Sequence, residues 1–179
     1  MAGFSFVERL RGTYYRLSDP FVELPITLDV EAHVRRLRTH VASANGRIRA
    51  VLLADAPVQG TLGLRPLTDR RIPYELAFVG DDGRRYLLRG EKDLSWLAPI
   101  ETLAVLPFTI GVEEGRPQPE VRGAAAADGP KGTWPEVRGA AAADGPKGTW
   151  IEVARGTMRS DTTRESVRAL ARSLRASPY

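Results

Sequence analysis

The side chains in this sequence that could carry chemistry do not form a recognised catalytic or metal-binding pattern. The two histidines, His33 and His40, are seven residues apart on the expected polar face of a helix, and Arg36 between them would repel a metal ion. The chain has no cysteine, which excludes thiol nucleophiles, thiolate metal sites and disulfides. We therefore expect no catalytic residue, no metal site and no cofactor.

Paired carboxylates are the next candidates, because two acids in different surroundings can act as general acid and base. The pair Asp81-Asp82 is explained by a turn, and Glu113-Glu114 lies in a stretch that we expect to be irregular. An enzyme would have to use the one polar cluster that the pattern offers, which is Tyr74, Glu75, Arg89 and Lys92. The sequence does not decide whether the protein is an enzyme, and it favours a protein without catalytic activity.

Basic residues gather around one predicted hairpin and could form an anion-binding patch, made of Arg70, Arg71, Arg84, Arg85, Arg89 and Lys92. Nucleic-acid binding is not expected, because aromatic residues are not interleaved on the exposed side of these strands. The glycine-rich fingerprints of nucleotide-binding loops are also absent from the sequence.

Length and composition fit a single domain spanning residues 1–179, since 42% of the residues are hydrophobic and the net charge is only +4. No apolar run approaches the ~20 residues that a membrane-spanning helix needs, which leaves at most peripheral membrane contact. The N-terminus lacks the basic start and apolar core of a secretory signal, so we expect a cytoplasmic protein.

The strongest structural signal is a β-hairpin between Arg71 and Lys92, whose two arms alternate apolar and polar residues around Asp82-Gly83. The apolar side chains of the two arms should face a core or a ligand, and they are Tyr74, Leu76, Phe78, Tyr86 and Leu88. We take these five as the candidate ligand-binding residues.

The remaining elements follow from the same periodicities. Further strands are predicted at Phe4–Leu17, 22–28, Arg47–Ala54, Val58–Pro66 and Ile100–Ile110. Pro25 suggests an edge strand, and Ala56-Pro57 suggests a break between strands. One helix is predicted at Asp29–Val41, from apolar residues at i, i+4, i+7 and i+11, ending near Asn45-Gly46.

The sequence PEVRGAAAADGPKGTW occurs twice without a change, at Pro119–Trp134 and Pro135–Trp150. Two polar copies are too few for a solenoid, so we interpret residues 111–148 as an irregular insert in a long hairpin. A second helix is predicted after Thr162, with an apolar stripe that we expect to pack on the sheet and an arginine face that could instead contact a membrane or nucleic acid.

The order of the segments ERLRGTY, LPITLDVEAHVRRL, PVQGTLGLRPL, RRIPYELAFVGDDGRRYLLRGEKDL and IETLAVLPFTI resembles the β-rich accessory domain of bacterial glucose–methanol–choline oxidoreductases of the cholesterol-oxidase type. The residues that match the most recognisable motif are Tyr74, Leu76, Phe78, Asp82, Gly83, Arg84, Leu88, Gly90 and Lys92. The resemblance implies an accessory module in lipid or steroid metabolism, without flavin or oxidase activity.

Together these features predict a mainly β (α+β) architecture, in which an antiparallel meander curls into a barrel or bent sheet with one helix in the N-terminal third and one at the C-terminus. The expected function is a non-catalytic module that binds an apolar, lipid- or steroid-like molecule or a partner oxidoreductase. The alternatives are an interaction protein that assembles through its insert or C-terminal helix, and an anion-binding module that uses the arginine-rich hairpin.

Overall fold

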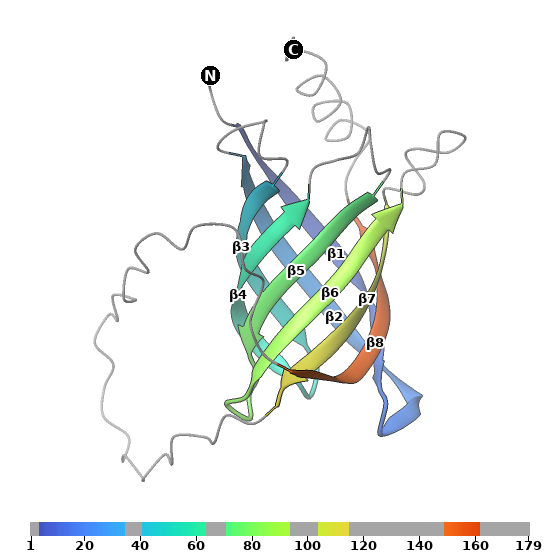
Figure 1. The fold of residues 1–179 in the computed structure, drawn as a ribbon. Coiled ribbons are helices and arrows are strands. Elements are labelled where there is room, and N and C mark those ends of the chain that lie inside the picture. The colour runs from blue at the N-terminus through green and yellow to red at the C-terminus, as the bar shows by residue number, and fades with distance from the viewer. Residues whose placement is uncertain (1–3, 35–40, 64–70, 94–103, 115–148, 162–179) are drawn as a thin grey trace, which may run out of the picture.

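The computed structural model describes residues 4–34, 41–63, 71–93, 104–114 and 149–161. Eight antiparallel strands form a closed barrel in which each strand pairs with the next and the last pairs with the first (Figure 1). The strands are β1 (Phe4–Arg16), β2 (Asp19–Val34), β3 (Val41–Ala50), β4 (Ala54–Gly63), β5 (Arg71–Val79), β6 (Arg85–Asp93), β7 (Val105–Glu113) and β8 (Trp150–Ser160). The predicted mainly β, barrel-like architecture is therefore confirmed.

One face of every strand supplies the core. All buried members of the core cluster have even residue numbers, from Leu10 in β1 to Met158 in β8. Side chains alternate between the two faces of a strand, so this shared parity places one continuous set inside the barrel and the other outside. The β1–β8 pairing, which runs from Leu10 opposite Ser160 to Arg16 opposite Ala154, closes the wall.

The predicted hairpin is confirmed. Strands β5 and β6 pair from Arg71 opposite Asp93 to Val79 opposite Arg85, and the turn between them contains Gly83 with a φ of 75°. Glycine adopts this backbone conformation without steric cost, because it has no Cβ atom. Asp82 accepts a hydrogen bond from the backbone N–H of Arg84, which fixes the turn further.

The predicted helix at Asp29–Val41 is wrong for its first part, because Asp29–Val34 lies in β2. Val30 and Val34 are separated by an even number of residues, so they share a face in a strand as well as in a helix. Ala32 between them is also buried, but its small side chain concealed the alternation. Asn45-Gly46, expected to end the helix, lies inside β3, and residues 35–40 are outside the described part.

Two strand boundaries were also predicted wrongly. The segment Arg47–Ala54 contains the turn between β3 and β4, which consists of Val51, Leu52 and Leu53 and lacks the usual glycine, proline or asparagine. Conversely, Ala56-Pro57 lies within β4, where Pro57 is opposite Arg47. The sequence signals for turns fail here because an apolar turn and a proline inside a strand both depend on tertiary contacts.

Pro25 does not lie in an edge strand, because the closed barrel has none. Its carbonyl accepts a hydrogen bond from Val51 at 3.2 Å, beyond the last paired residue of β3. The backbone N and O atoms of one residue point to the same side of a strand. The side of Pro25 that lacks an N–H therefore faces β3 beyond the end of the β2–β3 ladder, where no strand hydrogen bond is lost.

The last predicted strand, Ile100–Ile110, overlaps β7, but β7 begins at Val105 and continues to Glu113. Its inward residues are Leu106, Phe108 and Ile110. The hairpin of β7 and β8 is confirmed by the pairing of Glu113 with Trp150. The predicted irregular insert begins too early, because residues 111–113 belong to β7. Residues 115–148 of the insert and the C-terminal helix, 162–179, lie outside the described residues.

The core combines small and large side chains from different walls. Alanines dominate the inner face of β3 and β4, whereas aromatic side chains project inward from β1, β5, β6 and β7. The rings of Phe78 and Tyr86 stack with a centroid distance of 5.5 Å. The interior of an eight-stranded barrel is narrow, so bulky residues on one side require small residues on another.

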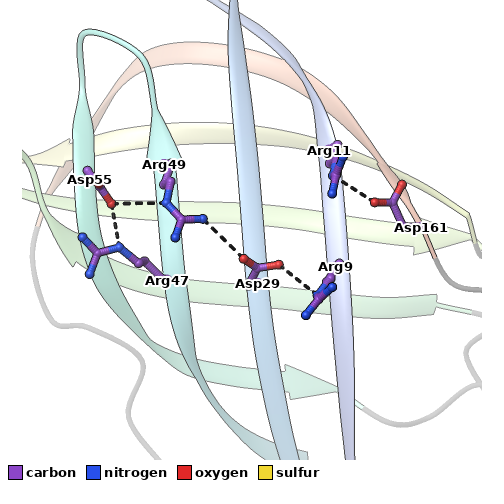
Figure 2. Close-up of polar contacts among 7 residues, drawn as sticks. All are labelled: Arg9, Arg11, Asp29, Arg47, Arg49, Asp55 and Asp161. Carbon is purple, nitrogen blue, oxygen red and sulfur yellow. Dashed lines mark hydrogen bonds and ion pairs between the residues drawn. The ribbon is translucent and has the colours of Figure 1, made fainter.

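The outer face carries ion pairs across neighbouring strands. A chain of contacts links Arg9, Asp29, Arg49, Asp55 and Arg47 over β1 to β4, and Arg11 contacts Asp161 nearby (Figure 2). The hydrogen bond from Arg47 lowers the pKa of the Asp55 carboxyl. All these groups are exposed to solvent, so each contributes little to stability. Within the described ranges, no helix has the length and apolar character needed to cross a membrane.

Candidate functional site

A pocket of about 660 Å³ lies at the end of the barrel where three short turns connect the strands. We call this the turn end; its turns join β1 to β2, β3 to β4 and β5 to β6, at the bottom of Figure 1. The pocket lining combines apolar and charged side chains: Arg16, Leu17, Ser18, Leu52, Leu53, Asp81, Asp82, Tyr86, Glu152, Val153 and Ala154. Its volume lies in the range typical of small-molecule sites.

Backbone hydrogen bonds between the turns hold the pocket in shape. The N–H of Asp81 donates to the carbonyl of Leu53 at 2.9 Å, and the N–H of Leu17 donates to the carbonyl of Val153 at 2.9 Å. The first bond joins the β5–β6 turn to the β3–β4 turn, and the second joins the β1–β2 turn to β8. The lining residues therefore come from a frame that is fixed by the barrel itself.

Leu52 has an unusual backbone conformation, with a φ of 63° in the β3–β4 turn. An L-residue other than glycine or asparagine is strained in this region by about 1–2 kcal/mol. Its side chain gains little from burial, since 68% of the residue is exposed. The turn thus holds an apolar side chain at the rim of the pocket at a cost to stability.

Two tyrosines lie beside the pocket. The hydroxyl of Tyr86 donates to Asp82 Oδ2 at 2.8 Å, and burial followed by this hydrogen bond raises the pKa of Tyr86 to about 12. The hydroxyl of Tyr14 donates to the carbonyl of Val51, and burial raises its pKa as well. The positive charge of Arg16 opposes both shifts.

A second polar cluster lies inside the barrel. The Lys92 ammonium donates to Glu8 Oε1, and the Tyr74 hydroxyl donates to Glu8 Oε2 at 2.6 Å. Lys92 also lies 5.5 Å from the centre of the Tyr74 ring. Burial, and then the charge and hydrogen bond of Glu8, raise the pKa of Tyr74 well above its ordinary value. The Lys92 ammonium and the Tyr74 hydroxyl thus each have a partner within the cluster.

The five predicted ligand-binding residues are all buried in the core cluster, as their alternation predicted. Of these, only Tyr86 lines the turn-end pocket, whereas Tyr74 belongs to the cluster with Glu8. Leu76 and Leu88 have no exposed surface and are opposite each other across β5 and β6. They fill the centre of the barrel.

The residues of the predicted anion-binding patch do not lie together. Arg71 and Arg89 are on the outer wall beside Glu91 and Glu75, Arg84 and Arg85 are near the turn end beside Asp82 and Glu113, and Lys92 is inside. Arg70 is outside the described residues. The barrel wall also divides the possible enzyme cluster, with Tyr74 and Lys92 inside and Glu75 and Arg89 outside.

Strand parity in the sequence contained a signal for the buried cluster. Lys92 shares the parity of Tyr86 and Leu88, and Glu8 shares the parity of Leu10 and Tyr14. A lysine and a glutamate on the apolar faces of two strands indicate a buried ion pair. This pair was not predicted, because Lys92 was grouped with the arginines of the hairpin. The pocket had no such signal, because its residues come from three turns and from the ends of β1, β6 and β8.

Among the described residues, no group of three or more histidines, aspartates and glutamates could hold a metal ion. Comparisons of this chain with protein-family models, curated proteins and solved structures found no match.

Proposed function

We propose that this protein is a non-catalytic module that binds a small apolar, lipid- or steroid-like molecule in the turn-end pocket. The observation that carries the proposal is a pocket of about 660 Å³ whose lining includes the apolar side chains of Leu17, Leu52, Leu53 and Val153 together with polar and charged groups. Apolar contacts with polar groups that fix orientation are what small-molecule sites use. The proposed ligand lies at the end of the barrel, not among the central core residues.

The strained conformation of Leu52 supports this proposal. A residue that costs stability persists when the surrounding structure enforces it, and such residues cluster at functional sites. Asparagine adopts a positive φ more readily than leucine. Leu52→Asn therefore removes an apolar side chain from the rim and relieves the turn at the same time.

The test measures binding of the uncharged fluorescent probe N-phenyl-1-naphthylamine by the full chain. We expect the parent to bind the probe and Leu52→Asn to bind it several-fold more weakly, because a leucine side chain contributes about 1.5–3 kcal/mol when it is fully buried and less at a rim. Thermal unfolding should show that the variant is at least as stable as the parent.

The matched control is Val7→Asn, which removes an exposed apolar side chain from the outer face of β1, away from the pocket. This variant should bind the probe as the parent does. Equal weakening in both variants, or no binding by the parent, would contradict the proposal.

Exposed apolar residues favour a second candidate function, an interaction with a partner protein. Phe21 is 94% exposed in β2, and Val22 and Val51 are about half exposed near the same end of the barrel. Exposed apolar patches mark interaction sites. An oxidoreductase partner is suggested only by the resemblance to the accessory domain. A loss of partner binding in Phe21→Ser, with probe binding unchanged, would separate the two candidates.

A further inference from the structure

In the part of the chain that the structure describes, Arg16 is the one positively charged side chain that lines the turn-end pocket. It is opposite Ala154 in the β1–β8 ladder, and Ala154 is 1% exposed and faces the core. Residues directly opposite each other project to the same face of a sheet. Arg16 therefore points toward the inner side of the turn end, where it lines the pocket.

The charged neighbours of Arg16 in the pocket are engaged with other groups. Glu152 pairs with Arg155 through both carboxylate oxygens, and Asp82 accepts hydrogen bonds from the Tyr86 hydroxyl and from the backbone N–H of Arg84. Asp81 accepts a hydrogen bond of 3.3 Å from the backbone N–H of Asp55. Among the described residues, the ion pairs of Asp82 and Glu152 are with Arg84 and Arg155, not with Arg16.

A guanidinium carries five donors and a permanent charge, so a half-buried arginine that pairs with no carboxylate of the described residues is suited to bind an anionic group. The apolar residues Leu53 and Val153 line the same pocket and provide contacts for a hydrocarbon body. The pocket therefore combines apolar side chains with one arginine, Arg16, which could pair with an anionic head group.

We infer that the ligand of the turn-end pocket is an apolar molecule that ends in an anionic group, and that Arg16 is the residue that recognises this group. The inference rests on the proposed function, and it narrows the apolar ligand to an organic acid such as a long-chain carboxylate. The pocket also contains carboxylates that would attract a cationic ligand instead, namely Asp81, Asp82 and Glu152. The experiment therefore compares head groups of both charge signs.

The experiment uses displacement of N-phenyl-1-naphthylamine from the full chain by dodecanoate, dodecan-1-ol and dodecylammonium, below their micelle thresholds and at about pH 8, where the carboxylate is ionised. The three competitors share one hydrocarbon chain and differ in the head group. We expect dodecanoate to displace the probe at a concentration roughly 10-fold lower than dodecan-1-ol, as a charge-assisted hydrogen bond allows.

The same competition is measured with Arg16→Met, which keeps an unbranched apolar side chain, and with Arg71→Met on the outer wall as the matched control. Arg16→Met should lose the preference for dodecanoate while its affinity for dodecan-1-ol changes by less than about twofold. Arg71→Met should retain the preference.

Three outcomes would overturn the inference while leaving the proposed function intact: the parent prefers dodecylammonium, it does not distinguish the acid from the alcohol, or Arg16→Met keeps the preference. The first two are read from the parent alone and do not depend on the folding of a variant. Failure of the parent to bind the uncharged probe would instead overturn the proposed function, and this inference with it.

Discussion

The ion pair between Lys92 and Glu8 differs from the ion pairs on the outer wall because both partners are shielded from solvent. Lys92 is 2% exposed and Glu8 is 9% exposed, whereas Arg89 and Glu75 on the outside are largely in water. Removing one member of a buried pair leaves an uncompensated charge in a medium of low polarity. Surface pairs have no such penalty, because water solvates the remaining group.

We therefore predict that Lys92→Met lowers the free energy of unfolding by about 3–5 kcal/mol. The double variant Glu8→Leu with Lys92→Met removes both charges and should recover most of this loss. Urea unfolding measures both effects. The matched control is Arg89→Met, which should cost about 0–1 kcal/mol. A similar cost for Lys92→Met and Arg89→Met would show that the buried pair has no special energetic role.

At the scale of single elements, three inward-facing glycines allow strands to approach closely. A Cβ atom on Gly60 would lie 1.9 Å from the carbonyl oxygen of Glu75 in β5, and Gly12 and Gly46 have equally close neighbours. Glycine in a strand often marks a sharp bend where another backbone comes near. These positions permit the curvature that lets a sheet close on itself.

Gly60→Ala should consequently destabilise the barrel by about 3 kcal/mol or more, because the backbone that the new methyl group meets cannot rotate away as a side chain can. Gly83→Ala is the control, since its Cβ would have no neighbour within 4 Å and the substitution strains only the positive φ. Its cost should be about 1 kcal/mol. Chemical unfolding measures the loss of unfolding free energy in each variant, which is steric for Gly60→Ala and conformational for Gly83→Ala. An equal loss in the two variants would contradict the close approach at Gly60.

The sequence predicted some elements better than others for physical reasons. The hairpin around Asp82-Gly83 was predictable because alternation and a glycine turn are local signals. The helix at Asp29–Val41 failed because Val30 and Val34 fit both periods, and the β3–β4 turn failed because Val51 and Leu52 look like strand residues. Such ambiguities are resolved by pairing with neighbouring strands, which one segment does not reveal.

At the scale of the whole molecule, barrel closure depends on the pairing of β1 with β8, elements at opposite ends of the described chain. The sequence indicated a meander but not the number of strands or this register, since no local pattern encodes a contact between distant strands. The same closure creates the turn-end pocket, because Arg16 of β1 and Glu152 to Ala154 of β8 meet only when the wall is complete. The candidate site is thus a product of the topology.

Closure also buries tyrosines at both ends of the barrel, which predicts sensitivity to alkaline pH. The pKa values of Tyr14, Tyr74 and Tyr86 are all raised above the ordinary value of 10.0, and that of Tyr86 rises to about 12. The folded state retains these protons more tightly than the unfolded state. The stabilisation is therefore complete below about pH 10 and is lost as the pH rises through the folded pKa values.

We expect the urea midpoint to fall progressively above about pH 10, with phenolate absorbance of the buried tyrosines appearing together with unfolding. Tyr86→Phe removes one of the three groups, so the fall in stability should be less steep in this variant even though its stability at neutral pH is lower, because the ring loses its hydrogen bond to Asp82. An identical pH dependence in the parent and in Tyr86→Phe would mean that the Tyr86 proton is not held more tightly in the barrel than in the unfolded chain.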